Sequence, residues 1–529
     1  MFPGHTDKLK NINLPNRYAY IVLIWLVLFI FYGLTAWKVL SLPVFSSPDE
    51  TANYIFATQY KNTGQIPIPM DIYLPGSWRS IINNGQAFVP GSFTFFPALL
   101  GLIGKIFQKF GILMFGPALA ATAIVCWWYF VKKITDNKAS AWFAAVFLAS
   151  LPIYWFYANR GLWQNGIFTS LLIINLYLLI IAWEKKFWPI SLLTGVMWGT
   201  MVAIRPSEAV WLIVGLLVVL VINWRKLPYK QMLIAIIGGV LPLVILFGLQ
   251  KQTYGNYLSI GYKPTSALEP SATLQETDSY HKLKNIFFPF GTDSNRAIKT
   301  FSKNAVKPLT YIFITGIVCL VWLLSDKKAN KRTKYFIISG LVGGLALILL
   351  YGNYKFIEYP VSDEATLGSS YLRYWLPLFI IISFSFGWSG SRLFSANKFL
   401  KYLIMLATGI ILGINLNTIW SSDIGIRQTF PFFKNMQEQS RWVKANTPEN
   451  SVIIGNDKIV FPPRQAVGVN GGNVKISNFN NSLPELAPTY IFLFNTGDYQ
   501  RIKIEFDKFK VDNLLDGPGG SGLVQITPK

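Results

Sequence analysis

The sequence predicts an all-α polytopic membrane protein of about eleven transmembrane helices, followed by a small extracytoplasmic α/β domain. Of its 529 residues, 52% are hydrophobic, 16% are aromatic and only 14% are charged. The apolar residues come in long blocks separated by short connections, which is the pattern of membrane-spanning segments. Because hydrocarbon offers no hydrogen-bonding partners, each block must pair its own backbone and is expected to be a helix.

The formal net charge of +23 reflects the orientation of the chain in the membrane rather than binding to nucleic acid. Basic residues gather in alternate connections, which the positive-inside rule places in the cytoplasm. This predicts a multi-pass protein of the plasma (inner) membrane, with a cytoplasmic N-terminus and no nucleic-acid partner. The basic connections include Lys132 and Lys133, Lys185 and Lys186, Arg225 and Lys226, and the cluster from Lys327 to Lys334.

The transmembrane domain is expected to cover residues 18–420, after a cytoplasmic basic tail at 1–17. A first span at 18–40 leads into an outer loop at 41–111. This loop ends in the amphipathic run Phe93–Phe110, which suits a helix lying in the membrane interface. The later spans are predicted at 112–131, 139–158, 165–183, 187–205, 208–223, 231–250, 307–325, 335–352, 371–391 and 402–420.

Two outer regions depart from this pattern. Residues 251–304 form a large polar loop, and residues 421–529 read as the soluble α/β domain. In that domain a helix at Gln437–Asn446 should end before Pro448, because the residue before proline avoids the helical region. Ser451–Ile454 and Tyr490–Phe494 read as short buried strands.

The motif Ser47-Pro48-Asp49-Glu50, just beyond the first span, has two interpretations. Ser47 as N-cap, Pro48 at the first helical position and Glu50 closing a capping box would simply start a helix running to about Lys61. A carboxylate at the mouth of a helical bundle can also act as a general base. Spacing favours the cap, whereas location favours the base.

Three arginines, Arg160, Arg205 and Arg373, fall at the predicted outer ends of spans. Snorkelling to the interface would explain any one of them. The positive-inside rule nevertheless makes arginines on the outer side unexpected, and a guanidinium suits bidentate phosphate binding. We therefore predict that these arginines cradle a lipid phosphate.

The order of these parts resembles the GT-C glycosyltransferases that use polyprenyl-phosphate sugar donors, and the resemblance covers nearly the whole chain. The motifs that carry it are Pro48-Asp49-Glu50, Ile204-Arg205-Pro206, Tyr254-Gly255 with Gly261-Tyr262, and Tyr371-Leu372-Arg373-Tyr374.

The resemblance implies a role for each matched residue. Asp49 would be the catalytic base, and Glu50 would orient groups or bind the acceptor. Arg373 would hold the donor phosphate. The remaining members of the predicted donor-binding set are Arg205, Arg160, Tyr371 and Tyr262.

One position departs from the resemblance. Many relatives carry an acidic residue after the third span, where this chain has Asn165. An asparagine cannot be an anionic base or a strong metal ligand. No cofactor is therefore predicted, and the divalent metal that the resemblance allows is disfavoured.

The predicted activity is inverting transfer of a hexose or pentose from a polyprenyl-phosphate-linked sugar to an acceptor lipid, glycan or protein outside the bilayer. A non-catalytic transporter or assembly protein for lipid-linked glycans is the alternative, and it would carry charges at mid-membrane. A glycan polymerase or ligase is a second alternative. Few charges fall within the predicted spans, which favours the transferase.

Overall fold

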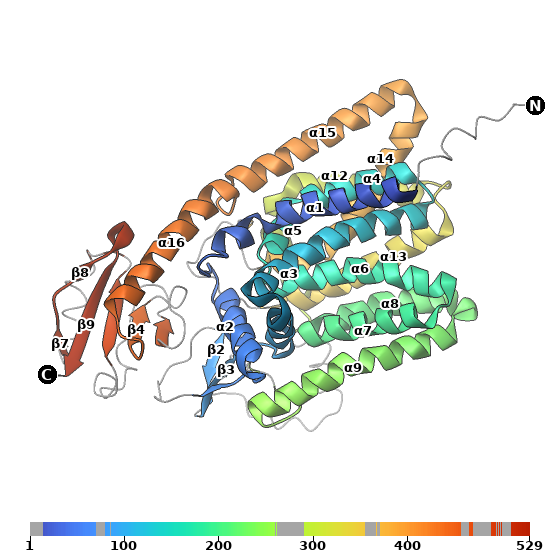
Figure 1. The fold of residues 1–529 in the computed structure, drawn as a ribbon. Coiled ribbons are helices and arrows are strands. Elements are labelled where there is room, and N and C mark those ends of the chain that lie inside the picture. Colours follow the sequence, from blue (N-terminus) through green and yellow to red (C-terminus); the bar gives the residue numbers. More distant parts are fainter. Residues whose placement is uncertain are drawn as a thin grey trace, which may run out of the picture.

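The computed structural model shows a long helical bundle with a sheet beyond one of its ends (Figure 1). It describes residues 14–69, 80–84, 86–259, 261, 290–354, 367, 371–455, 465–468, 488–493, 495, 497, 499 and 509–528. The bundle consists of α1 (Leu14–Val39), α3 (Phe95–Thr135), α4 (Lys138–Ser150), α5 (Pro152–Asn159), α6 (Gln164–Lys185), α7 (Trp188–Ile204), α8 (Ala209–Asn223), α9 (Tyr229–Tyr254), α12 (Thr310–Ser325), α13 (Lys331–Gly352), α14 (Leu378–Ala396) and α15 (Lys398–Ser421).

In these described ranges, nine helices are long and apolar enough to cross a membrane. The pair α4 and α5, bent by 61°, would make a tenth span, and α7 is a shorter apolar helix. Each of the eleven predicted spans coincides with one of these helices or with the bent pair. The bend falls at Leu151, whose backbone is extended (φ −63°, ψ 119°) because Pro152 follows it.

The predicted interfacial run is helical but continuous with the next span. Helix α3 starts at Phe95 and runs to Thr135, with a single break at Gln108 (φ 55°, ψ −149°). The break lies where the interfacial run was expected to end. At this break, the first part of α3 changes direction relative to the second part.

Between α1 and α3 lie α2 (Pro48–Thr63) and a small antiparallel sheet, which the sequence analysis did not predict. Its strands are β1 (Ile68–Pro69), β2 (Ile81–Asn83) and β3 (Ala87–Pro90), in the order β1-β3-β2. The Tyr254 hydroxyl, at the end of α9, donates to the Pro90 carbonyl at 2.6 Å. Gly261 packs against the same backbone, where a Cβ would lie 2.2 Å from the Pro90 oxygen. The sheet is thereby fixed to the bundle.

The C-terminal region consists of α16 and a second sheet. Helix α16 (Ile426–Asn446) begins eleven residues before the predicted helix and ends where predicted. The strands have the order β5-β4-β6-β9-β7, with β8 also paired to β9. They are β4 (Val452–Gly455), β5 (Gln465–Gly468), β6 (Thr489–Leu493), β7 (Phe509–Val511), β8 (Leu515–Asp516) and β9 (Gly522–Pro528). The two predicted strands correspond to β4 and β6, which pair in parallel.

Helix α16 is attached to the start of the chain. The Gln437 side chain donates to the carbonyls of Lys38 at 3.2 Å and Leu42 at 2.9 Å, where α1 ends. The second sheet therefore lies at the same end of the bundle as α2 (Figure 1).

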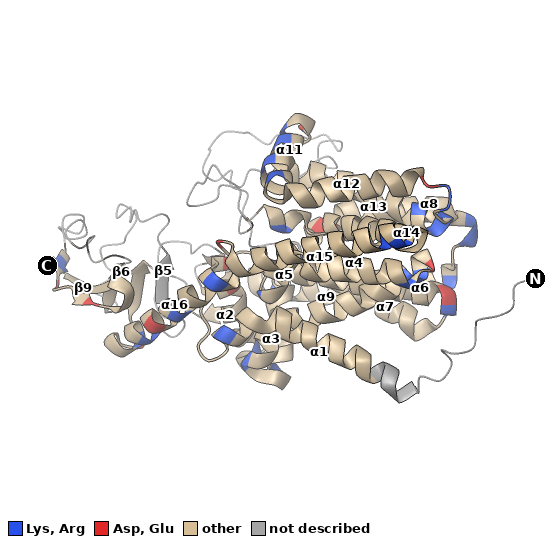
Figure 2. Cartoon of the chain, turned by 90° about the horizontal axis from the view of Figure 1, so that it is seen from above, with Lys and Arg blue, Asp and Glu red and all other residues tan. Residues whose placement is uncertain are grey.

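The two ends of the bundle differ in charge (Figure 2). The predicted basic connections α3–α4, α6–α7, α8–α9, α12–α13 and α14–α15 share the end away from α2, called here the basic end. The opposite end is called the site end. Among described residues, the charged side chains that are nine-tenths or more buried all lie there: Glu50, Arg160, Arg205, Glu208 and Arg373.

Close helix packing depends on glycine. A Cβ at Gly195 of α7 would lie 1.8 Å from the Ala235 carbonyl oxygen of α9, and one at Gly199 would lie 2.2 Å from that of Gly239. Small residues are what allow helix backbones to approach this closely in a membrane.

Candidate active site

Helix α2 starts as the motif predicts. Ser47 is extended (φ −120°, ψ 138°), its Oγ accepts from the Asp49 N–H at 3.3 Å, and Pro48 occupies the first turn. The cap sets the direction of the first turn, from which Asp49 and Glu50 reach different partners.

Asp49 is paired with Arg373, 324 positions later in the chain. The distance from Asp49 Oδ2 to Arg373 Nη1 is 3.0 Å. The Ser80 hydroxyl donates to the other carboxylate oxygen. The Asp49 side chain is 33% exposed and that of Arg373 only 10%, so the carboxylate is the accessible member of the pair.

Arg373 is held by aromatic rings. It belongs to the 3-10 helix η6 (Leu372–Trp375), and its guanidinium carbon lies 4.6 Å from the centre of the Trp163 ring. Its Nη2 donates to the Tyr374 hydroxyl at 3.2 Å. Stacking and hydrogen bonding leave the planar fork facing the α2 carboxylate.

Glu50 is paired with Arg160 instead of closing a capping box, so the interpretation as a helix start holds for Ser47 and Pro48 but not for Glu50. The Arg160 Nε and Nη2 donate to its two oxygens at 3.1 and 2.5 Å, and Arg160 also donates to Ser46. Both side chains are more than nine-tenths buried. Burial raises the pKa of Glu50, although the Arg160 guanidinium acts in the opposite sense. Glu50 joins α2 to the segment between α5 and α6.

Arg205 is neutralised by Glu208, which the sequence analysis did not single out. Arg205 Nε lies 2.8 Å from Glu208 Oε1. Glu208 also accepts from the Tyr351 hydroxyl at 2.7 Å and from the Trp211 indole at 2.5 Å. The available signal was a carboxylate three residues after an arginine, at the start of a span.

Asn165 connects the two arginine clusters. Its Oδ1 accepts from Arg205 Nη1 at 3.1 Å, and its Nδ2 donates to the Arg373 carbonyl at 3.2 Å. The Tyr374 ring also touches both, 5.4 Å from the Arg205 guanidinium carbon and 5.1 Å from that of Arg373. The amide thus uses both its donor and its acceptor, which a carboxylate could not do.

In the structure, Asp49, Arg373 and Arg205 lie close together. Arg160 is instead paired with Glu50. Tyr371 donates to the Tyr354 carbonyl at 2.9 Å. Tyr262 lies outside the described residues. In the part of the chain that the structure describes, no three His, Cys, Asp or Glu side chains come together as a metal site.

The chemistry available here is proton acceptance beside anion binding. An accessible carboxylate can take a proton from an entering hydroxyl or amine. The adjacent guanidinium can stabilise negative charge that develops on a leaving phosphate. Both groups are held in place by other side chains of the protein.

Proteins of known structure share this fold. Residues 92–248 match the family model described as dolichyl-phosphate-mannose-protein mannosyltransferase. The apo crystal structure of ArnT from Cupriavidus metallidurans superposes with a TM-score of 0.54 at 10% identity, covering 96% of this chain and 98% of that one. The apo oligosaccharyltransferase of Archaeoglobus fulgidus gives a TM-score of 0.49 at 11% identity, covering 92% of this chain and 71% of that one. No curated protein sequence matches the chain.

Proposed function

We propose, from the premise that this chain has the GT-C fold of the glycosyltransferase superfamily, that it transfers a monosaccharide from a polyprenyl-phosphate donor to an acceptor. The reaction takes place at the site end of the bundle, in the extracytoplasmic half of the plasma membrane. The observation that carries the proposal is the contact between Asp49 and Arg373, which combines an accessible base with a buried cation.

In the proposed reaction, Arg373 binds the phosphate of the donor. The acceptor oxygen or nitrogen forms a bond to the anomeric carbon as the bond from that carbon to the phosphate oxygen breaks. The bonding electrons leave with the lipid phosphate, and Asp49 takes the acceptor proton. A single displacement of this kind inverts the anomeric centre.

Donor binding changes the partner of Asp49. Without donor, the Arg373 fork is shared between Asp49 and Tyr374. A phosphate that binds the same guanidinium competes with Asp49, which then turns its accessible carboxylate to the acceptor. The ion pair thus keeps the base in place until the leaving group is bound.

The other charged residues position this pair. Arg160 with Glu50 fixes the first turn of α2, and Arg205 with Glu208 fixes Asn165 beneath Arg373. Glu50 is too buried to meet a substrate, which supports an orienting role. In the described ranges the buried charged side chains gather at the site end of the bundle, which favours the enzyme over a transporter with charges along its spans.

The test uses membranes containing the full chain and a radiolabelled polyprenyl-phosphate monosaccharide. The parent should move label out of the polyprenyl lipid, and Asp49→Asn should slow this by roughly 100-fold or more. Asp423→Asn, which makes the same change at an exposed position before α16, is the control. Transfer by Asp49→Asn at the parent rate, with normal insertion, would remove Asp49 from this role.

A further inference from the structure

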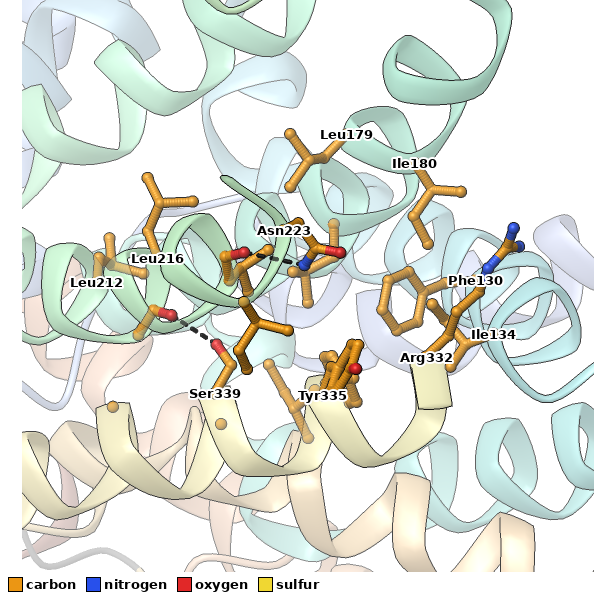
Figure 3. Close-up of a pocket in the computed structure, with 18 of the residues that line it drawn as sticks. Phe130, Ile134, Leu179, Ile180, Leu212, Leu216, Asn223, Arg332, Tyr335 and Ser339 are labelled. Carbon is orange, nitrogen blue, oxygen red and sulfur yellow. Dashed lines mark hydrogen bonds between the residues drawn. The ribbon is translucent and has the colours of Figure 1, made fainter. Parts of the chain in front are cut away.

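A mostly apolar slot of about 690 Å³ opens at the basic end of the bundle. Figure 3 shows part of its lining. Its walls come from α3 and α6 on one side and α8, α13 and α14 on the other. The slot reaches from Arg332 at its mouth to Trp211 and Leu378 at its deep end. This volume is within the range of small-ligand sites, about 300–1,000 Å³.

The interior of the slot is mostly apolar. Its lining includes Leu179, Leu216 and Phe130, and two of its polar side chains bond to backbone carbonyls. Ser339 donates to the Gly215 carbonyl at 2.6 Å and Asn223 to the Val219 carbonyl at 2.9 Å (Figure 3). An apolar chain fits such a surface, and a polar solute does not.

The mouth of the slot has an excess of positive charge. Five basic side chains and one carboxylate, Glu184, line it. The carboxylate is shared by Lys133 at 2.5 Å and Arg332 at 3.6 Å. In the described ranges no carboxylate pairs with the remaining three, which are Arg225, Lys226 and Lys331. Phosphate bound there would meet exposed, uncompensated cations.

We propose that this slot binds an anionic phospholipid of the leaflet at the basic end. One acyl chain lies between α6 and α8, and the phosphate lies among Arg225, Lys226 and Lys331. The positive-inside rule makes this the cytoplasmic leaflet, which carries the anionic lipids that basic pockets between helices recognise. The deep end of the slot reaches Trp211, which donates to Glu208 beside Arg205. The proposed phosphate position is nevertheless distinct from that of the donor, because the charged mouth is at the other end of the bundle.

The experiment uses the full chain in nanodiscs and phosphatidylglycerol with a diazirine on one acyl chain. After irradiation, labelled peptides should come from α8 and α13. Phosphatidylcholine with the same chain should label them far less. Lys226→Gln with Lys331→Gln should weaken phosphatidylglycerol binding about 25-fold, because each basic residue contributes roughly fivefold.

Lys398→Gln with Lys401→Gln removes the same charge at the same end but outside the slot, and should keep parent labelling. Both pairs of substitutions are at the surface, so folding is not the variable tested. Equal labelling by the two phospholipids, or unchanged labelling in the Lys226 and Lys331 variant, would overturn the proposal. So would labelling of the slot by a diazirine polyprenyl phosphate that excludes phosphatidylglycerol.

Discussion

Asn165 accepts a hydrogen bond from Arg205 at 3.1 Å while its own amide donates to the main chain of Arg373. The side chain at the position where the resemblance implies an acidic residue is therefore hydrogen-bonded on both sides. An amide suits this position because one neighbour is a donor, the Arg205 guanidinium, and the other is an acceptor, the Arg373 carbonyl.

The first prediction concerns that amide. Asn165→Asp keeps the acceptor for Arg205 but places a carboxylate oxygen against the Arg373 carbonyl. The lost donor leaves a buried acceptor unsatisfied, which costs about 1–3 kcal/mol. We expect a lower melting temperature and at least tenfold slower sugar transfer, measured side by side. Parent-like values of both would show that the amide donor is dispensable.

The second prediction concerns the guanidinium of Arg373. Arg373→Lys keeps the charge but cannot reach Asp49 and Tyr374 together, because lysine lacks the planar fork. Loss of a charge-assisted hydrogen bond of about 1.5–3 kcal/mol should reduce kcat/KM for the donor roughly 10- to 150-fold. Arg392→Lys, at the basic end, is the matched control. An unchanged kcat/KM would mean that charge alone is sufficient at position 373.

The third prediction separates a buried charge from its partner. Glu208→Gln leaves Arg205 buried without a counter-charge and should destabilise the protein by about 3–5 kcal/mol. Combining it with Arg205→Gln removes both charges and should recover part of the loss. Thermal unfolding of the two single variants and the double variant gives the coupling. Additive losses would mean that the two side chains do not act as a pair.

The fourth prediction is a pH dependence at Glu50, whose pKa is raised by burial. The folded state then binds the proton more tightly than the unfolded chain. Stability contributed by protonation is present at low pH and is lost as the pH rises through the folded pKa. The melting temperature of the parent relative to Glu50→Gln should therefore fall from pH 4 upward. A melting-temperature difference that rises with pH would mean that the Glu50 pKa is lowered in the folded state. Glu438→Gln, at an exposed position on α16, is the control.

The fifth prediction tests the helix contact between α7 and α9. Gly195→Ala places a methyl group against the Ala235 carbonyl, so the helices must separate and the protein should lose more than about 1 kcal/mol. Gly409→Ala on α15 meets open space and should be neutral or stabilising by up to about 1 kcal/mol. Equal melting temperatures for these two variants would contradict the close packing.

The helices could be predicted because hydrocarbon enforces their length and composition locally. The start of α2 was equally local, since Ser47 and Pro48 act within one turn. The partners of the charged side chains could not be predicted in this way. Glu50 pairs with Arg160, 110 positions later, and no pattern within a helix reveals which distant side chain faces it. The sheet formed by β1, β2 and β3 went unnoticed because its strands have only two to four residues.

Gln437 donates a hydrogen bond to the Leu42 carbonyl, just after α1 and 395 positions earlier in the chain. During synthesis, the stretch that carries Asp49 emerges early. The hydrogen bonds from Gln437 to the end of α1 can form only after α16 has left the ribosome. A nascent chain halted before that helix could still pair Glu50 with Arg160 and Asp49 with Arg373, but it would lack the Gln437 contacts. The earliest loop made is therefore among the last parts of the molecule to mature.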